Sequence, residues 1–93
     1  MKVVINRCYG GFSLSEKAYE FLGLEWDGYG YAKYRDYDFR TDPKLIECVE
    51  TLGSEADGML AYLKVVEIPD DVEWEIVGYD GMETIHEVHR VWY

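Results

Sequence analysis

The dipeptide Asp80-Gly81 places the strongest constraint on how this chain folds. It separates two segments rich in strand-forming residues, 72–79 and 82–92. Asp-Gly favours a two-residue hairpin loop, because both positions of such a loop need a positive backbone φ angle. A two-residue loop pairs Tyr79 with Met82. The sequence therefore predicts an antiparallel hairpin with Ile76 opposite Ile85 and Glu75 opposite His86, the latter a cross-strand ion pair on the outer face.

The same register places polar residues on the apolar face of the hairpin. It sets Trp74 opposite Glu87 and Val72 opposite His89. Residues directly opposite each other share a face of the sheet, so a carboxylate and an imidazole would lie beside Trp74. Three explanations remain open: the register is wrong, a bulge shifts it, or this face carries a polar site. A bulge is the commonest remedy.

Two segments predict helices. Asp42 supplies an N-cap and Pro43 the first helical position of a helix over 43–52, and Gly53 ends it. A second helix is expected over 14–22. Ser13 and Glu16 form a capping-box pattern at its start, and Gly23 follows its end.

The rest of the pattern sets the fold class. Residues 2–7 and 59–68 are rich in strand formers, and the second segment stops at Pro69. Residues 24–40 mix aromatic residues with glycines and charges, which favours an irregular loop or a weak edge strand. We therefore expect a single α+β domain over residues 1–93. Two helices would pack on one face of a mostly antiparallel sheet of about four strands that ends in a β-meander.

The net charge of −10 is unevenly distributed over the 93 residues. Residues 1–41 hold six bases and six acids, whereas residues 42–93 hold three bases and thirteen acids. This balance argues against direct binding of nucleic-acid phosphates or of an anionic membrane by the bulk surface. There is no signal-peptide pattern and no apolar run of the ~20 residues that a membrane span needs. A cytoplasmic protein without a disulfide framework is expected, and its oligomeric state is left open.

A glycine turn joins the first strand to the first helix. Backbone N–H groups at such a turn suit an anion such as a nucleotide phosphate. The alternative is that the glycines serve only to reverse the chain, since neither common phosphate-binding motif is present. The candidate ligand-binding residues are Arg7, Gly10, Gly11, Ser13 and Ser15.

Two sets of residues are candidates for binding a protein partner. The first lies in the aromatic segment, where tyrosines offer large contact area at a low entropy cost; the second is the carboxylates of the hairpin, which can imitate a phosphate backbone. The alternatives are that the aromatics cover the core and that the carboxylates form a solvated face. The candidates are Tyr31, Tyr34, Arg35 and Tyr37, with Glu73, Glu75 and Glu83.

Catalytic and metal sites find little support in the sequence. Cys8 precedes a predicted helix start, but it needs a base, and His86 and His89 are the two histidines of the chain. The two histidines are three residues apart on a predicted strand, so they face opposite sides and do not suit a shared metal. We therefore predict no catalytic residue, no metal and no cofactor.

Several blocks of the sequence resemble a family of small uncharacterised bacteriophage and prophage proteins. The blocks are residues 4–15 (VINRCYGGFSLS), 40–43 (RTDP), 63–72 (LKVVEIPDDV), 79–81 (YDG) and 89–92 (HRVW). The resemblance covers nearly the whole chain. It implies a phage origin and the host cytoplasm as location, and it transfers no reaction and no functional residue.

These observations rank three hypotheses. The first is a small acidic accessory protein that binds, without catalysis, a host or anti-phage defence factor and antagonises it. The second is a binder or sponge of a small anionic ligand such as a nucleotide. The third is a cysteine-dependent enzyme.

Overall fold

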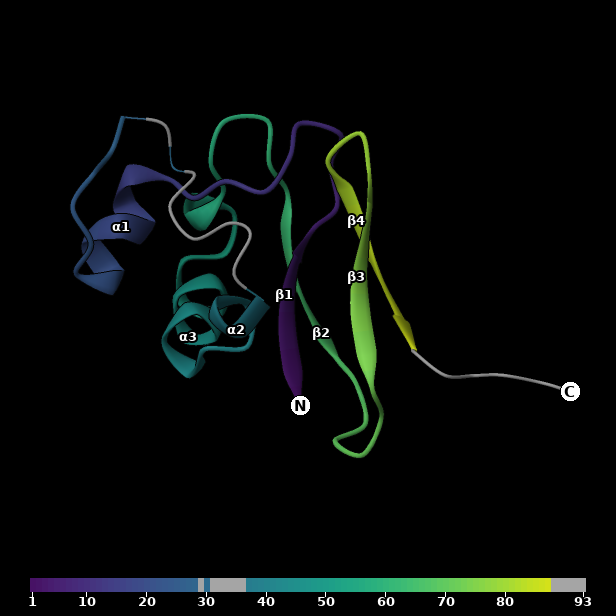
Figure 1. The fold of residues 1–93 in the computed structure, drawn as a ribbon. Coiled ribbons are helices and arrows are strands. Elements are labelled where there is room, and N and C mark those ends of the chain that lie inside the picture. Colours follow the sequence, from purple (N-terminus) through teal and green to yellow (C-terminus); the bar gives the residue numbers. More distant parts are fainter. Residues whose placement is uncertain (29, 31–36, 88–93) are drawn as a thin grey trace, which may run out of the picture.

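The computed structural model describes residues 1–28, 30 and 37–87 (Figure 1). Its elements follow one another along the chain as β1 (Lys2–Asn6), α1 (Glu16–Leu22), α2 (Tyr37–Arg40), α3 (Pro43–Leu52), the 3-10 turn η1 (Gly53–Ala56), β2 (Leu63–Glu67), β3 (Trp74–Tyr79) and β4 (Met82–Glu87).

The expected α+β class with four antiparallel strands is confirmed. The strands form two hydrogen-bonded pairs, β1 with β2 and β3 with β4. The expected three-strand meander is wrong, because its first strand, β2, pairs with the first strand of the chain and not with β3. Three α-helices are present in the described part of the chain, one more than the sequence indicated.

The elements stack in three layers (Figure 1). The helices lie on one side of the β1–β2 pair, and the β3–β4 hairpin lies on the other side. Alternate residues of β1 serve the two interfaces, as the two-residue period of a strand requires. Val4 belongs to the apolar cluster with the helices, whereas Val3 and Ile5 pack with Ile76 and its neighbours in the hairpin.

The helix starts show which local signals were decisive. α3 has the expected Asp42 cap, whose carboxylate accepts from the Lys44 N–H at 2.8 Å. α1 begins later than expected, at Glu16, and Ser15 rather than Ser13 is its N-cap. The Ser15 hydroxyl accepts from the Ala18 N–H at 3.1 Å, so the predicted Ser13–Glu16 capping box is wrong.

The strand expected over 59–68 is shorter in the structure and begins at Leu63. The Asp57 carboxylate accepts from the Leu63 N–H at 2.9 Å, which fixes this start. Partial burial raises the pKa of Asp57, and its hydrogen bond to the Leu63 N–H opposes that shift. Before the strand, Leu60 has a φ of 63°, a left-handed conformation that no strand continues through.

The predicted register of the last hairpin is confirmed. Tyr79 pairs with Met82, Ile76 with Ile85 and Trp74 with Glu87. Asp80 and Gly81 both have positive φ angles, of 50° and 88°, as a two-residue hairpin loop requires. The ladder runs unbroken from Trp74 to Tyr79, so the described part of the hairpin has no bulge. The pairing proposed for His89 lies outside the described residues.

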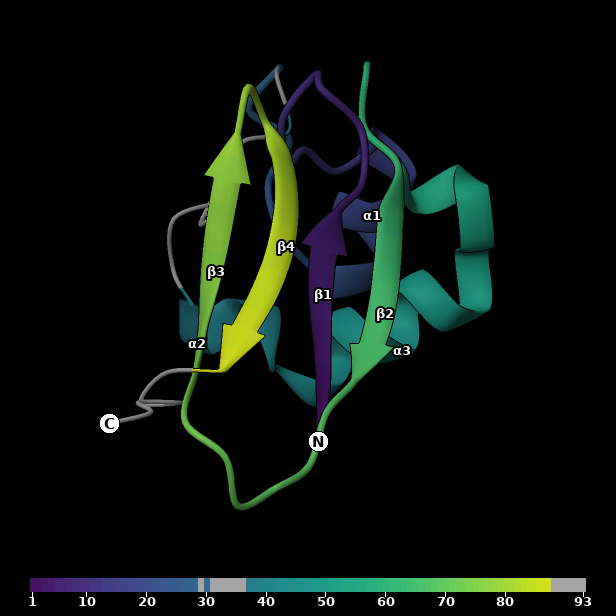
Figure 2. The same cartoon turned by 90° about the vertical axis from the view of Figure 1, so that its right-hand side faces the viewer.

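A buried ion pair fills the space between β1 and β4. Figure 2 shows these two strands side by side, yet they are not hydrogen-bonded as neighbours of one sheet. The guanidinium of Arg40, which is 2% exposed, binds both carboxylate oxygens of Glu83, at 2.7 and 3.0 Å. It also lies 3.7 Å from the ring centroid of Phe12, an apolar and cation–π contact.

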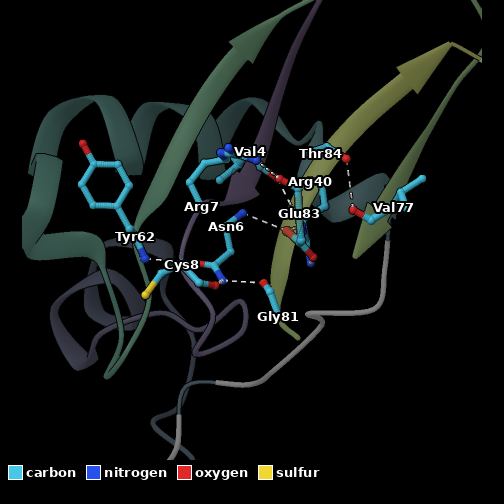
Figure 3. Close-up of polar contacts among 10 residues, drawn as sticks. All are labelled: Val4, Asn6, Arg7, Cys8, Arg40, Tyr62, Val77, Gly81, Glu83 and Thr84. Carbon is cyan, nitrogen blue, oxygen red and sulfur yellow. Dashed lines mark hydrogen bonds and ion pairs between the residues drawn. The ribbon is translucent and has the colours of Figure 1, made fainter. Parts of the chain in front are cut away.

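The same pair satisfies the open edge of β1 (Figure 3). In β1 the odd-numbered residues direct their backbone groups to β2, and the even-numbered ones direct theirs away from it. Arg40 donates to the carbonyl of Val4 at 3.3 Å, and the Asn6 N–H donates to the Glu83 carboxylate at 2.8 Å. Two backbone groups that would otherwise need a neighbouring strand are thus bound by side chains.

We expect the variant Glu83→Ala to lose about 3–5 kcal/mol of unfolding free energy, because it leaves the Arg40 charge buried and uncompensated. The double variant Arg40→Met, Glu83→Ala removes both charges, so its loss should be no larger than that of Glu83→Ala alone. Urea unfolding followed by far-UV circular dichroism measures the losses of the two single variants, Glu83→Ala and Arg40→Met, and of the double variant. A double variant whose loss equals the sum of the two single losses would contradict this account.

Candidate functional site

The serines of the predicted ligand-binding turn have structural partners. Ser15 caps α1, and its hydroxyl also donates to the Glu55 carbonyl at 2.6 Å. Ser13 is 1% exposed and donates to the Met59 carbonyl at 3.3 Å. Both hydroxyls therefore hold the turn against the segment that precedes β2.

The glycines of this turn allow close backbone contacts. A Cβ atom on Gly10 would lie 2.0 Å from the Leu60 carbonyl oxygen, so a side chain does not fit there. Gly11 lies against the tip of the β3–β4 hairpin, at Gly81. Packing accounts for these residues without a ligand, and anion binding at the turn stays a prediction.

A single buried amide locks the turn, the hairpin tip and the start of β2 together (Figure 3). Asn6 is fully buried; its Nδ2 donates to the carbonyls of Cys8 and Gly81, at 2.6 and 2.7 Å. Its Oδ1 accepts from the Tyr62 N–H at 2.8 Å. The sequence does not single out this residue, because an asparagine at the end of a strand carries no signal of such distant partners.

The residues predicted to bind a partner do not all lie on one surface. Glu73 and Glu75 are exposed at the start of the hairpin. Glu83 is different: it is 13% exposed and bound to Arg40, so its place in a partner-binding surface is corrected to a structural role. Tyr31, Tyr34 and Arg35 lie outside the described residues, and Tyr37 is the first residue of α2.

Exposed carboxylates gather at one end of the two strand pairs. β1 begins there, β2 ends there, β3 begins there and β4 ends there, which brings distant parts of the sequence together (Figure 2). Two cations at this end are engaged: the Met1 amine binds Asp70, and Lys2 binds Glu50 at 3.0 Å, which raises the pKa of Lys2. We call this set the acidic end; it consists of Glu67, Asp70, Asp71, Glu73, Glu75 and Glu87.

A cleft of about 410 Å³ opens between the two strand pairs. One wall is the face of the β1–β2 pair that points away from the helices, and the other is the inner face of the β3–β4 hairpin. Most of its lining is aliphatic, with Trp74 as its aromatic member. The lining residues are Ile5, Arg7, Lys64, Val66, Ile68, Pro69, Val72, Trp74, Thr84, Ile85 and Glu87.

Two basic residues lie at the end of the cleft opposite the acidic end. Arg7 follows β1. Lys64 is on β2, where it pairs with Ile5 of β1. Both are exposed, and among the residues that the structure describes neither forms a salt bridge with a carboxylate. From the sequence, Arg7 is expected in the glycine turn and Lys64 is not a candidate. The two-residue period of the strand indicates which face Lys64 occupies, but not that Arg7 lies near it.

The cysteines and the described histidine are not assembled into a catalytic group. Cys48 is fully buried on α3, whereas Cys8 is partly buried in the turn after β1. His86 lies on the outer face of β4, where its Nε2 is 3.0 Å from the Thr84 hydroxyl. Residues 1–28, 30 and 37–87 hold no group of three or more His, Cys, Asp or Glu side chains suited to a metal ion.

Comparisons with known proteins add no relative. No protein-family model, no curated protein and no solved structure matches this chain. The resemblance to a phage protein family therefore stays a prediction. Within the described residues, the helices are too short or too polar to cross a membrane.

We expect the two thiols to differ sharply in reactivity. Burial raises the pKa of Cys48 from 9.0 to about 11, so this thiol stays protonated at pH 8 and should not react in the folded protein. A colorimetric thiol reagent should therefore modify one cysteine at pH 8 and both in urea, and Cys8→Ser should abolish the first reaction. Because the unfolded thiol ionises first, Cys48 should also lower stability as the pH rises from 9 to 11. Equal reaction of both thiols in the folded protein would contradict this burial.

Proposed function

We propose that this protein acts by binding, without catalysis, to a bacterial host or defence protein and blocks a basic surface on it. The observation that supports the proposal is the acidic end, where six exposed carboxylates from β2, β3, β4 and the loop between β2 and β3 share one end of the fold. Basic surfaces on proteins that handle nucleic acids contact phosphates through lysines and arginines. An array of carboxylates can compete with the phosphates for these basic side chains.

The carboxylates of the acidic end are rigidly attached to the fold. This favours a role in binding over a role in solubility alone. The carboxylates are attached to strand ends and to the loop that joins β2 to β3, not to a long tail. The Met1 N–H groups hold this loop through the Ile68 carbonyl, at 2.6 Å, and the Asp70 carboxylate. A fixed charge pattern loses little conformational entropy on binding, which increases affinity for a surface of matching spacing.

The net negative charge should increase the rate at which the protein associates with a basic partner. A chain with a charge of −10 attracts a cationic surface over a distance of about one Debye length, ~8 Å at physiological ionic strength. Electrostatic attraction of this kind speeds association and falls steeply with salt. The affinity for the partner should therefore depend strongly on ionic strength.

The test uses charge reversal at the acidic end. Wild-type protein and the variant Asp71→Lys, Glu73→Lys, Glu75→Lys are used to capture proteins from a lysate of the bacterial host with and without phage infection. A protein captured by the wild type is then purified, and its affinity is measured at low and at physiological salt. We expect the variant to bind about a hundredfold more weakly and with a smaller salt dependence.

A matched variant controls for net charge. Glu16→Lys, Glu20→Lys, Glu47→Lys changes the charge equally, but on the exposed faces of α1 and α3, away from the strand ends. It should bind the purified partner within a few-fold of the wild type. If both variants bind like the wild type, or if a nucleic acid does not compete with the protein for the partner, the proposal is wrong.

A further inference from the structure

The cleft between the strand pairs carries two positive charges at one end, although the whole protein is negatively charged. The described residues include six lysines and arginines. Three of them pair with carboxylates: Lys2 with Glu50, Lys17 with Glu55 and Arg40 with Glu83. Two of the other three, Arg7 and Lys64, meet at one end of the cleft. A chain with a net charge of −10 thus brings two of its three described cations without a salt bridge to one cavity.

The Arg7 side chain is held in place from the protein side. Its Nη1 donates to the Glu83 carbonyl at 2.8 Å, which leaves the other guanidinium donors for a ligand (Figure 3). Lys64 lies on β2, on the same wall of the cleft as Arg7, and offers three further donors. Two cations at one end of a cavity suit a single anionic group, which accepts from both.

The floor of the cleft favours an apolar body for the rest of the ligand. It is formed largely by aliphatic side chains of both strand pairs, among them Ile5, Val66, Ile68 and Ile85, and Trp74 also lines it. The aliphatic side chains offer no hydrogen bonds, so a polar ligand body would lose most of its water without compensation. An aliphatic body instead gains from the burial of apolar surface.

The two ends of the cleft define a direction. Arg7 contacts Glu83, and Glu87 lies four residues further along β4, or about 13 Å at the rise of a strand. Glu87 and the acidic end repel an anion from that side. An anionic head therefore has one favoured place, at Arg7 and Lys64, and the body of the ligand extends toward Trp74.

We propose that this cleft binds a small amphiphilic anion, with one carboxylate or phosphate head between Arg7 and Lys64 and an aliphatic chain along the floor toward Trp74. The volume of about 410 Å³ lies within the range of small-molecule sites. A nucleotide shares the anionic head but has a polar base and sugar, which this floor does not serve. The proposal concerns the cleft, which shares Glu87 with the acidic end, and it does not depend on the protein-binding function.

The test is a titration with decanoate and with decyl phosphate, below their micelle-forming concentrations, followed by tryptophan fluorescence and by thermal unfolding. We expect saturable binding of at least one of them, with a rise in melting temperature. Trp74→Phe should remove the fluorescence change but keep the thermal shift. Comparison of the two compounds distinguishes a carboxylate head from a phosphate head.

Variants and control ligands decide whether the site is the cleft. Lys64→Glu should weaken binding on the order of tenfold or more, as the loss of a charge-assisted hydrogen bond implies. The matched variant Lys44→Glu, on α3, should bind like the wild type. Decanol and decyltrimethylammonium share the chain but lack the anionic head, and adenosine monophosphate lacks the chain. Binding of any of these three as tight as that of the better anion, an unchanged affinity in Lys64→Glu, or no saturable binding of either anion would overturn the proposal.

Discussion

The fold depends on the buried contact between Arg40 and Glu83. This pair stands where a hydrogen-bonded ladder between β1 and β4 would otherwise form, and it binds a carbonyl and an N–H of the β1 edge directly. A continuous four-stranded sheet would bring the inner face of the hairpin level with the face of β1. Because the ion pair separates the two strands, the hairpin stands apart from the first pair, and the cleft opens between them.

Burying an ion pair between the two strand pairs costs desolvation free energy for both charges. The geometry of the pair explains how this cost is offset. The planar guanidinium binds both carboxylate oxygens and lies over the ring of Phe12, so its charge is neutralised and its apolar face is covered. The Glu83 carboxylate uses its remaining capacity on the Asn6 N–H. Lysine in place of Arg40 would keep the charge but lose this two-oxygen contact.

Local signals in the sequence were sufficient for much of the fold. The hairpin register followed from Asp80-Gly81, and α3 followed from Asp42 and Pro43, because each depends on the conformations of a few adjacent residues. The cap of α1 was misplaced by two residues, since Ser13 and Ser15 both suit a cap and only the tertiary contact of Ser13 with Met59 distinguishes them.

The candidate site was less accessible to sequence reasoning. The two-residue period places Glu83 on the inner face of the hairpin with Ile85, which is a local result, but its partner Arg40 is 43 residues away. The pairing of β2 with β1 is also non-local, and it is this pairing that brings Lys64 opposite Ile5 and into the cleft near Arg7. The acidic end could be anticipated as a charge excess, but its position required the strand order.

The position of Asn6 bears on how the protein is made. Its backbone N–H donates to the carboxylate of Glu83, 77 residues later in the chain. Its side chain donates to the carbonyl of Gly81, 75 residues later. Contacts of such long range form late in folding, since the intervening loop must close first. On the ribosome, the opening strand therefore emerges long before its last partners, and the helical layer can assemble while that strand still has one edge in water. The final hairpin can complete these contacts only after residue 83 has been synthesised.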